Sequence, residues 1–384
     1  MAGPIDFLIY SPFPKYSGGR ENWLHNLSQQ LRARGERVRA ISYATNRPPF
    51  YSLDQSGIEV IALPSIRYFD RAFVLVNRVT LGLPKFLDLA LFYPLIAGVH
   101  LRRARPQTLV CMNSIPEGFV ALVARVPFVV SVRSDVPKAL AGALGFLERP
   151  LKWLERRVLR GARKVLANGQ DTKERLAKAG IASTVVPNGV DFGRYSTPAA
   201  GDAVVAELER RARGKPVIAY VATMLAIKGA ADAVECAAAL KRRDADFMLA
   251  MVGKGNPGDF RRRAEALGLD DRVAFLGETN VVAAVLQRSS IFLGLSLENG
   301  MSMSTLEAMA AGVPVVARYV LTYRQLVENG VSGLLGATPA ELAECCIRLL
   351  REPDLARALA VRAQDTAREY DWPRVAEAFL AEVV

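Results

Sequence analysis

The chain has few of the residues that build metal centres and disulfide frameworks. Its 384 residues include only four cysteines and two histidines, His25 and His100. A zinc site needs closely spaced thiolates and imidazoles, and a disulfide framework needs more cysteine. No C-x-x-C spacing is present, so neither is expected, and adjacent Cys345 and Cys346 are predicted to be structural.

The sequence also lacks the marks of a membrane-spanning or exported chain. It has no run of about 20 uninterrupted apolar residues, and its first residues lack the charged-then-apolar pattern of a signal peptide. Repeats and low-complexity tracts are absent too. A soluble, cytoplasmic protein is therefore expected, and 51% hydrophobic residues can build the cores of two domains.

Charge is distributed unevenly along the chain. Residues 1–180 hold 27 basic and 13 acidic side chains, whereas residues 181–384 hold 23 and 25. The net charge of +12 therefore belongs to the first half. Such an excess favours an anionic partner, namely nucleic acid, a membrane surface or a phosphorylated substrate. Ordinary solvated arginines explain the excess nearly as well.

Short apolar runs alternate with helical patterns along the whole chain. Their apolar character is continuous, as a strand covered on both faces requires. The chain is therefore predicted to be α/β, with two doubly wound parallel-sheet domains that divide in the Gly- and Pro-rich stretch 188–202. The predicted strands are 5–12, 37–42, 57–64, 108–114, 127–133, 164–168 and 183–187, then 216–223, 247–253, 272–277, 291–296 and 313–317.

Ligands of open parallel sheets bind where strands end and helices begin, so these loops carry the candidate sites. Gly18 and Gly19 precede a helix and would let backbone N–H groups approach a phosphate, although two glycines are more often a plain turn. Lys228 and Gly229 stand at another helix start. A lysine there adds to the positive helix end and would bind a diphosphate, with an ordinary surface lysine as the alternative.

A third loop, GKGNPG at residues 253–258, matches the G-x-G-x-x-G pattern of dinucleotide sites. That pattern normally opens the first βαβ unit of a domain, and Pro257 removes a donor from the turn. We therefore predict a tight turn in which Gly253 and Lys254 lie near a ligand, and no NAD site.

The stretch SLENGMSMSTLEAMAAGVPVV, residues 296–316, places Glu298 and Glu307 on either side of glycine, methionine and small hydroxyl residues. A short helix is predicted to begin near Ser304. Residues 304–307 would then form a capping box in which Glu307 accepts from a backbone N–H. Alternatively, Glu307 accepts hydrogen bonds from a ribose diol while loop amides face phosphate.

Together these segments resemble the retaining nucleotide-sugar glycosyltransferases of family four, which have the GT-B fold of two facing Rossmann-like domains. The resemblance implies that domain 1–192 binds the acceptor and domain 193–369 the nucleotide sugar, with the reaction in the cleft. It also implies a C-terminal helix, 370–384, that crosses back to the first domain. The motifs recur in order over nearly the whole chain: SGGRENWLHNLSQQLRARGERV, VPNGVDFGRY, VATMLAIKG, MVGKG, VAFLGE, SLENGMSMSTLEAMAAGVPVVA, ENGVSGLL and REYDWPRVAEAFLAEV.

The resemblance also assigns roles to residues of the donor site. Glu307 is similar to the ribose-binding carboxylate, Lys228 to the diphosphate cation, and Gly18-Gly19 to the loop over the diphosphate. Glu298 or Asn299 would hold sugar hydroxyls. The following loop would offer its amides to the phosphates, from Gly300, Met301, Ser302, Met303 and Ser304.

The paired glutamates depart from the family pattern. Eight residues separate Glu298 from Glu307, where the family has seven, so Asn299 aligns with the first acid. Either a one-residue bulge restores Glu298 to that position, or an amide has replaced the acid.

Two further departures concern charge. Thr223 stands where the family commonly has a diphosphate-binding arginine, and Arg133 stands where it has a histidine, followed by Asp135. We hypothesise that Arg133 supplies the missing cation, because guanidinium binds phosphate in a bidentate fork.

The main chemical obstacle is the charge that a departing sugar leaves on the diphosphate. Lys228, Arg133 and helix amino termini can neutralise it without a metal, and no D-x-D cluster is visible. We predict metal-independent, retaining hexosyl transfer from a UDP- or GDP-sugar, without a further cofactor, in cell-surface polysaccharide or glycolipid synthesis. The alternatives are an inverting or epimerising GT-B enzyme with Asp135 as base, a glycosyltransferase of secondary metabolism, and a non-catalytic GT-B partner subunit.

Two segments of the basic first half bear on the acceptor. Residues 146–169 carry Trp153 and apolar positions at helical spacing among arginines, typical of a helix on an anionic membrane. A helix packed on a sheet fits that pattern at least as well, and the apolar stretch 83–103 poses the same choice. The charge asymmetry leads us to predict a peripheral enzyme on the inner face of the membrane, with a lipid-linked or glycan acceptor and no nucleic-acid partner.

Overall fold

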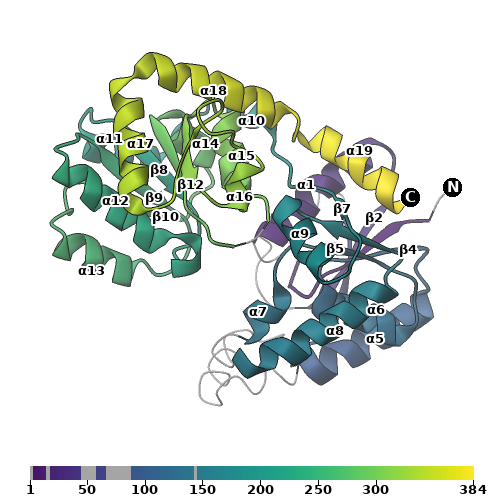
Figure 1. Ribbon diagram of the computed structural model, residues 1–384. Helices are drawn as coiled ribbons and strands as arrows, with labels where there is room; N and C mark the ends of the chain where they lie inside the picture. Colours follow the sequence, from purple (N-terminus) through teal and green to yellow (C-terminus); the bar gives the residue numbers. More distant parts are fainter. Residues whose placement is uncertain (1–2, 14–17, 45–57, 66–87, 142–144, 299) are drawn as a thin grey trace. The chain divides into compact units, whose positions relative to one another are not determined.

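The computed structural model describes residues 3–13, 18–44, 58–65, 88–141, 145–298 and 300–384, apart from the side chains at 90 and 139–141. The chain forms two compact units (Figure 1). One comprises Met1–Pro187 with Trp372–Val384, and the other comprises Asn188–Asp371. The sequence placed the divisions at 192 and 369 instead. Residues 188–192 join the second unit because Asn188 bonds the Met301 carbonyl and Val190 pairs with Asp371.

The first unit is built on a seven-stranded parallel sheet in the order β3-β2-β1-β4-β5-β6-β7. The central strands are buried on both faces, as their continuous apolar sequence predicts. Ile5 of β1 stands opposite Val38 of β2 on one side and Thr108 of β4 on the other. The strands are β1 (Ile5–Leu8), β2 (Val38–Tyr43), β3 (Glu59–Leu63), β4 (Thr108–Cys111), β5 (Val129–Val132), β6 (Lys164–Ala167) and β7 (Thr184–Val185).

Helices cover both faces of this sheet. Successive side chains of a strand point to opposite faces: Leu8 joins the core beneath α5, α6 and α8, whereas Phe7 packs against α1 and α19. The helices of the unit are α1 (Gly19–Ala33), α5 (Tyr93–Ala104), α6 (Phe119–Ala124), α7 (Val136–Ala141), α8 (Glu148–Gly161), α9 (Gln170–Lys178) and α19 (Trp372–Val383), with short turns η1 (Asp88–Phe92), η2 (Ser114–Gly118) and η3 (Gly145–Leu147).

The predicted return of the C-terminal helix to the first unit is confirmed. Phe379 of α19 is fully buried, and its ring stacks on Phe7 with 5.7 Å between centroids and meets the Trp23 ring edge-on at 5.8 Å. Lys164 Nζ of β6 pairs with Glu382 Oε2 at 2.9 Å. The last helix therefore completes the core of a unit whose sheet is nearly two hundred residues away in sequence.

The second unit is built on a six-stranded parallel sheet in the order β10-β9-β8-β11-β12-β13. Its strands are β8 (Val217–Val221), β9 (Met248–Val252), β10 (Val273–Gly277), β11 (Ile291–Gly294), β12 (Val315–Arg318) and β13 (Leu334–Gly336). Its helices are α10 (Phe192–Ser196), α11 (Ala203–Ala212), α12 (Ala230–Arg242), α13 (Gly258–Ala266), α14 (Val282–Gln287), α15 (Met303–Ala310), α16 (Leu321–Arg324), α17 (Pro339–Arg351) and α18 (Pro353–Arg368), with the turn η4 (Ala226–Lys228).

The two parallel sheets confirm the predicted fold class. Every strand predicted from an apolar run is present. Most are shorter than their runs, whereas β2 has the predicted six residues and begins one residue later. The sequence reading missed β13, because three residues give too short a run to distinguish from a loop. In the described part of the chain, no helix combines the length and the apolar character that crossing a bilayer would require.

Candidate functional site

The predicted donor residues gather at one edge of the second sheet. From β8 the chain proceeds outward to β9 and β10, then returns to build β11, β12 and β13 on the other side of β8. In such sheets a ligand crevice lies beyond the carboxyl ends of the strands at this switch point. Thr223 and Lys228 follow β8, Gly253 and Lys254 follow β9, and Glu298 follows β11.

Lys228 and Glu298 meet at the switch point although they lie 70 residues apart in sequence. Lys228 Nζ is 2.5 Å from Glu298 Oε2, and the two side chains are 29% and 44% exposed. An ion pair with this much exposure contributes little to stability. The pair therefore contributes little to holding the fold together.

Two glycines allow the loops of this site to approach one another. Gly229 has φ +85°, and a Cβ there would lie 2.5 Å from the Leu295 carbonyl oxygen. Gly253 has φ +144°, and a Cβ there would lie 1.9 Å from the Ala222 carbonyl oxygen. Left-handed backbone without a Cβ is what such close packing requires. The glycines thus hold the loops after β8, β9 and β11 against each other.

The start of α15 differs from the prediction. Its N-cap is Ser302, whose Oγ accepts from the Thr305 N–H at 3.3 Å and from the Thr305 hydroxyl at 2.9 Å. The capping box predicted at residues 304–307 is therefore wrong, because the helix begins one residue earlier and already has a cap. Glu307 lies beyond the first turn of α15, and its carboxylate takes no part in capping the helix.

Glu307 is half-buried beside α10, where Tyr195 is a neighbour that the sequence reading did not identify. Burial raises the pKa of the Glu307 carboxyl above its usual value, and a hydrogen bond from Tyr195 and the charge of Arg194 partly offset the rise. Asn188 Nδ2 donates to the Met301 carbonyl at 2.6 Å and fixes the loop that precedes α15. Both new residues lie in VPNGVDFGRY, a motif quoted above without assigned roles.

The remaining predicted donor positions lie in the same loop. Gly300 has φ +106°, and Met301 is buried, while Ser302, Met303 and Ser304 are partly exposed around the start of α15. Asn299 lies outside the described residues. Glu298 lies at the switch point beside Lys228. Which of the two residues fills the first acid position stays a prediction.

A second polar cluster occupies the switch point of the first sheet, between β1 and β4. Glu117, in the loop after β4, is fully buried. Its Oε1 accepts from the Tyr10 N–H at 2.8 Å and from Arg20 Nη1 at 3.2 Å. Burial raises the pKa of the Glu117 carboxyl despite the nearby Arg20. The sequence reading missed this residue, although a carboxylate in a loop after a strand could have indicated it.

Two buried polar atoms at this edge lack a hydrogen-bond partner in the described part of the chain. Among the described residues, Glu117 Oε2 and the Tyr93 hydroxyl have no hydrogen-bond partner. Such atoms normally find one, so they mark a place for water or for a ligand hydroxyl. Gly18 caps α1 at the same edge, and a Cβ at Gly19 would meet no atom within 4 Å.

Arg133 and Asp135 have structural partners within the first unit. Arg133 is buried, with its Cζ 3.6 Å from the centroid of the Trp23 ring, and burial lowers the pKa of its guanidinium well below the usual value. Asp135 Oδ1 accepts from the Lys138 N–H at 3.2 Å at the start of α7. Their roles as diphosphate cation and catalytic base stay predictions.

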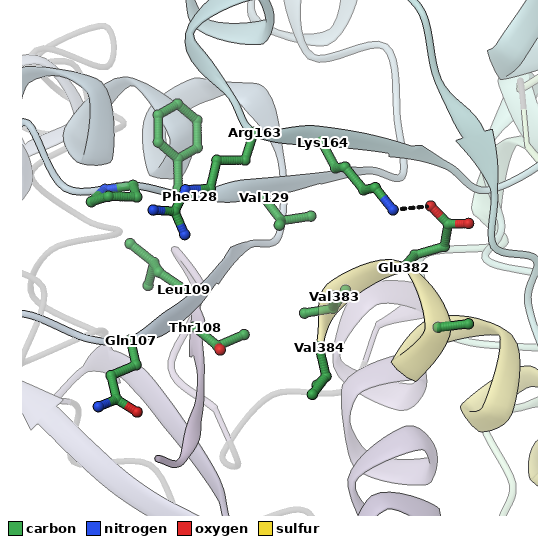
Figure 2. A pocket seen from close by; sticks show the side chains of 12 residues that line it. Gln107, Thr108, Leu109, Phe128, Val129, Arg163, Lys164, Glu382, Val383 and Val384 are labelled. Atoms are coloured by element: carbon green, nitrogen blue, oxygen red, sulfur yellow. Dashed lines mark hydrogen bonds and ion pairs between the residues drawn. The ribbon is translucent and has the colours of Figure 1, made fainter. Parts of the chain in front are cut away.

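A cavity of about 470 Å³ lies at the opposite edge of the first sheet, at the amino ends of β4, β5 and β6. Figure 2 shows Arg163 and Lys164 on one side of it and Glu382, Val383 and Val384 on the other. None of the predicted site residues lines it. Throughout the described ranges, no three His, Cys, Asp or Glu side chains are grouped so that they could hold a metal ion.

Two family models match the chain, one in each unit. Residues 17–194 match the model described as Glycosyltransferase Family 4, and residues 215–352 match Glycosyl transferases group 1. Curated relatives include the D-inositol 3-phosphate glycosyltransferases of Salinispora tropica (35% identity, 51% of this chain and 44% of the relative) and Actinosynnema mirum (29% identity, 67% and 64%). The matches thus span about half to two thirds of the relatives' length.

Solved structures with the same fold cover almost the entire chain. They include Anabaena HepE in complex with UDP and glucose (21% identity, TM-score 0.78, 99% of both chains) and the sucrose-phosphate synthase of Thermosynechococcus elongatus (21% identity, TM-score 0.79, 99% and 98%). These structures show that the chain has the GT-B fold. The two family models, one in each unit, show that it belongs to the glycosyltransferases of family four.

Proposed function

We propose that the protein transfers a hexose-type sugar from a UDP- or GDP-sugar to an acceptor hydroxyl. The observation that carries the proposal is the meeting of Lys228 and Glu298 at the switch point of the second sheet. The relatives support it, because the HepE structures hold UDP with glucose or UDP-glucose. Several curated relatives carry the name glycosyltransferase.

Each donor group would meet a side chain of matching chemistry. Glu307 would accept hydrogen bonds from the ribose diol, and Glu298 would accept them from sugar hydroxyls. Lys228 has three N–H donors, of which Glu298 uses one, so the others can bind a diphosphate. Besides the ammonium group of Lys228, the backbone N–H groups in the first turn of α15 would donate hydrogen bonds to the phosphates.

The proposal includes retention of anomeric configuration and independence from metal. Negative charge develops on the diphosphate as the sugar leaves, and Lys228 and the amino terminus of α15 would stabilise it there. Retention rests on the family resemblance. The anomeric configuration of the product, read by NMR, tests retention, and turnover in excess EDTA tests metal independence.

The acceptor would bind at the switch point of the first sheet, where Glu117 Oε2 and the Tyr93 hydroxyl lack partners among the described residues. A carboxylate and a phenol suit the hydroxyl groups of a carbohydrate. We further propose a lipid-linked or growing cell-surface glycan as acceptor and an enzyme at the inner face of the membrane. The exposed arginines of α8 support this part of the proposal.

A panel of UDP-, GDP- and ADP-sugars tests the proposal. A bound donor should raise the melting temperature of the wild type, and slow hydrolysis of that donor without acceptor should be measurable. Lys228→Ala and Glu307→Ala should lose both signals, and Glu265→Ala, an exposed glutamate on α13, should keep them.

Two outcomes would count against the proposal. Unchanged donor affinity in both site variants would refute the assigned site. Donor binding without hydrolysis or transfer to any acceptor would instead indicate a non-catalytic partner subunit.

A further inference from the structure

The turn η1 and helix α5, which follows it, carry an apolar ridge that nothing in the described part of the chain covers. Leu91, Leu95 and Val99 follow one another at four-residue spacing, and Leu95 is 62% exposed. Tyr93, Ala97 and Leu101 on the opposite side of the helix are buried against the sheet. The side chains of Leu91, Leu95 and Val99 therefore take little part in packing the described core.

Helix α8 carries a basic stripe with an aromatic side chain in it. Arg149, Trp153, Arg156 and Arg160 recur at helical spacing and are exposed, Trp153 to 67%. The buried side of the helix is formed by Glu155, Val158 and Leu159 instead. Within the described ranges, none of these three arginines pairs with a carboxylate.

Helix α6 joins these two features into one surface. Arg102 Nη2 of α5 donates to the Val123 carbonyl of α6 at 3.0 Å. A Cβ at Gly161, the last residue of α8, would lie 2.6 Å from Leu122 Cδ1 of α6. Figure 1 shows α5, α6 and α8 side by side on one face of the first sheet. Val123 of α6 is itself exposed.

We propose that this surface, the α5–α8 face, docks on a bilayer containing anionic lipids. The ridge Leu91, Leu95 and Val99 would enter the interfacial region together with Trp153, and the arginines of α8 would contact lipid phosphates. The inference deepens the proposed function by naming the surface that meets the membrane. Only the link to a lipid-linked acceptor rests on the proposed function. Membrane contact itself can be measured without donor or acceptor.

The chemistry of the face favours a bilayer over a protein partner. A bilayer interface offers apolar and anionic groups together, and tryptophan is enriched at that level. Amphipathic helices with basic polar faces bind it in its plane. The first half of the chain, with 27 basic and 13 acidic residues, adds long-range attraction to an anionic surface.

Sedimentation with vesicles tests the proposal on the full chain. Vesicles of phosphatidylglycerol and phosphatidylcholine should carry the protein into the pellet, whereas pure phosphatidylcholine should leave most of it in solution. Added salt should weaken the binding, because it screens the arginine contacts.

Two pairs of substitutions separate the apolar and basic contributions. Leu95→Glu with Trp153→Glu should abolish sedimentation, because both insert charge where apolar contact is expected. Arg156→Glu with Arg160→Glu should weaken it by at least about 25-fold, since each basic residue near an anionic surface contributes about fivefold.

Matched controls lie on the second unit. Val361→Glu replaces an equally exposed apolar residue of α18, and Arg351→Glu with Arg362→Glu reverses two exposed arginines. Both should sediment like the wild type. Circular dichroism and the melting temperature of each variant identify any that fail to fold, and Leu95→Ser with Trp153→Ser then serves as the milder apolar pair.

Three results would overturn the proposal. The first is equal recovery of the protein in the supernatant with both kinds of vesicle. The second is an equal loss of sedimentation in the control variants and the α5–α8 variants. The third is a wild-type dimer that binds no vesicle and that Leu95→Glu dissociates. Vesicle binding without donor hydrolysis would contradict the proposed sugar transfer and leave this inference standing. Hydrolysis without vesicle binding would contradict this inference and the proposed membrane location, and would leave the sugar transfer standing.

Discussion

At the scale of single residues, burial decides which carboxylates can act in a site. Glu298 is exposed and paired with Lys228, whereas Glu307 is half-buried and Glu117 is fully buried. Desolvation disfavours the charged form, so the pKa of both carboxyls rises. Two consequences can be measured, one in ligand affinity and one in stability.

Nucleotide affinity should depend on pH through Glu307. A ribose diol donates to the ionised carboxylate, so binding is complete above the pKa of Glu307 and declines as pH falls through it. Because that pKa is raised above 4.5, the decline should begin at a higher pH than for an exposed glutamate. Calorimetric titrations with UDP at several pH values give the affinity as a function of pH. The same titrations on Glu307→Gln give the part of the pH dependence that comes from ionisation of UDP itself.

Tyr195→Phe sharpens the test of Glu307. The Tyr195 hydrogen bond lowers the pKa of Glu307, so its removal should shift the decline in affinity to still higher pH. Parallel curves for wild type, Glu307→Gln and Tyr195→Phe would contradict a role for the Glu307 carboxylate.

Stability should depend on pH through Glu117. Its pKa is raised on folding, so the native state holds the proton more tightly than the unfolded chain. The wild type therefore loses stability as pH rises through the raised pKa, whereas Glu117→Gln cannot. The free energy of unfolding, from urea titrations at several pH values, should favour Glu117→Gln increasingly as pH rises above 4.5. A pH-independent difference would refute this.

At the scale of elements, patterns that depend on local sequence could be predicted, and those that depend on tertiary contact could not. Apolar runs indicated the strands because both faces of each sheet are covered. The cap of α15 was misplaced because Ser302 and Ser304 both precede a plausible first turn, and only hydrogen bonds select Ser302. The Lys228–Glu298 pair was invisible because its partners come from loops after different strands.

The same limit applies to the surface helices. The sequence raised both readings of 83–103 and of 146–169, membrane contact and packing on a sheet. The structure shows that α5 and α8 do pack on the sheet with one side. Which residues stay outside, such as Leu95 and Trp153, follows from the helix rotation and could not be read from composition.

The loop geometry around Gly229 gives a prediction at this scale. Gly229 and Gly214 have nearly the same φ, +85° and +82°, but only Gly229 has neighbours where a Cβ would stand. Gly214→Ala should cost about 1–2 kcal/mol for left-handed backbone. Gly229→Ala should cost more and should also weaken UDP binding, because it pushes Lys228 away from Glu298. Equal losses of stability with unchanged affinity would contradict the close approach.

At the scale of the whole molecule, the two units differ in how the chain builds them. The second unit is one continuous segment, Asn188–Asp371, whereas the first needs the last helix to complete its core. The family motifs implied this return of the chain. Phe379 of α19 packs on Phe7 and Trp23. This contact could not be predicted from sequence, because most of the chain separates Phe379 from the other two.

Truncating Phe379 should therefore destabilise a sheet far from it in sequence. Phe379→Ala removes a fully buried ring and should cost about 3–5 kcal/mol, whereas Glu377→Ala, exposed on the same helix, should cost little. Hydrogen exchange should quicken in β1 and β2 and stay unchanged in β8 and β9. Equal acceleration in all four strands would contradict the division into units.

The central claim is that the switch point of the second sheet binds a nucleotide sugar. Calorimetric titration of UDP and GDP into the wild type, Glu307→Ala and Glu265→Ala tests it most directly. We expect one of the two nucleotides to bind the wild type and Glu265→Ala alike, and Glu307→Ala to lose about 1.5–3 kcal/mol of binding free energy, the contribution of a charged hydrogen bond. Equal affinity in Glu307→Ala, or no binding of either nucleotide to the wild type, would contradict it.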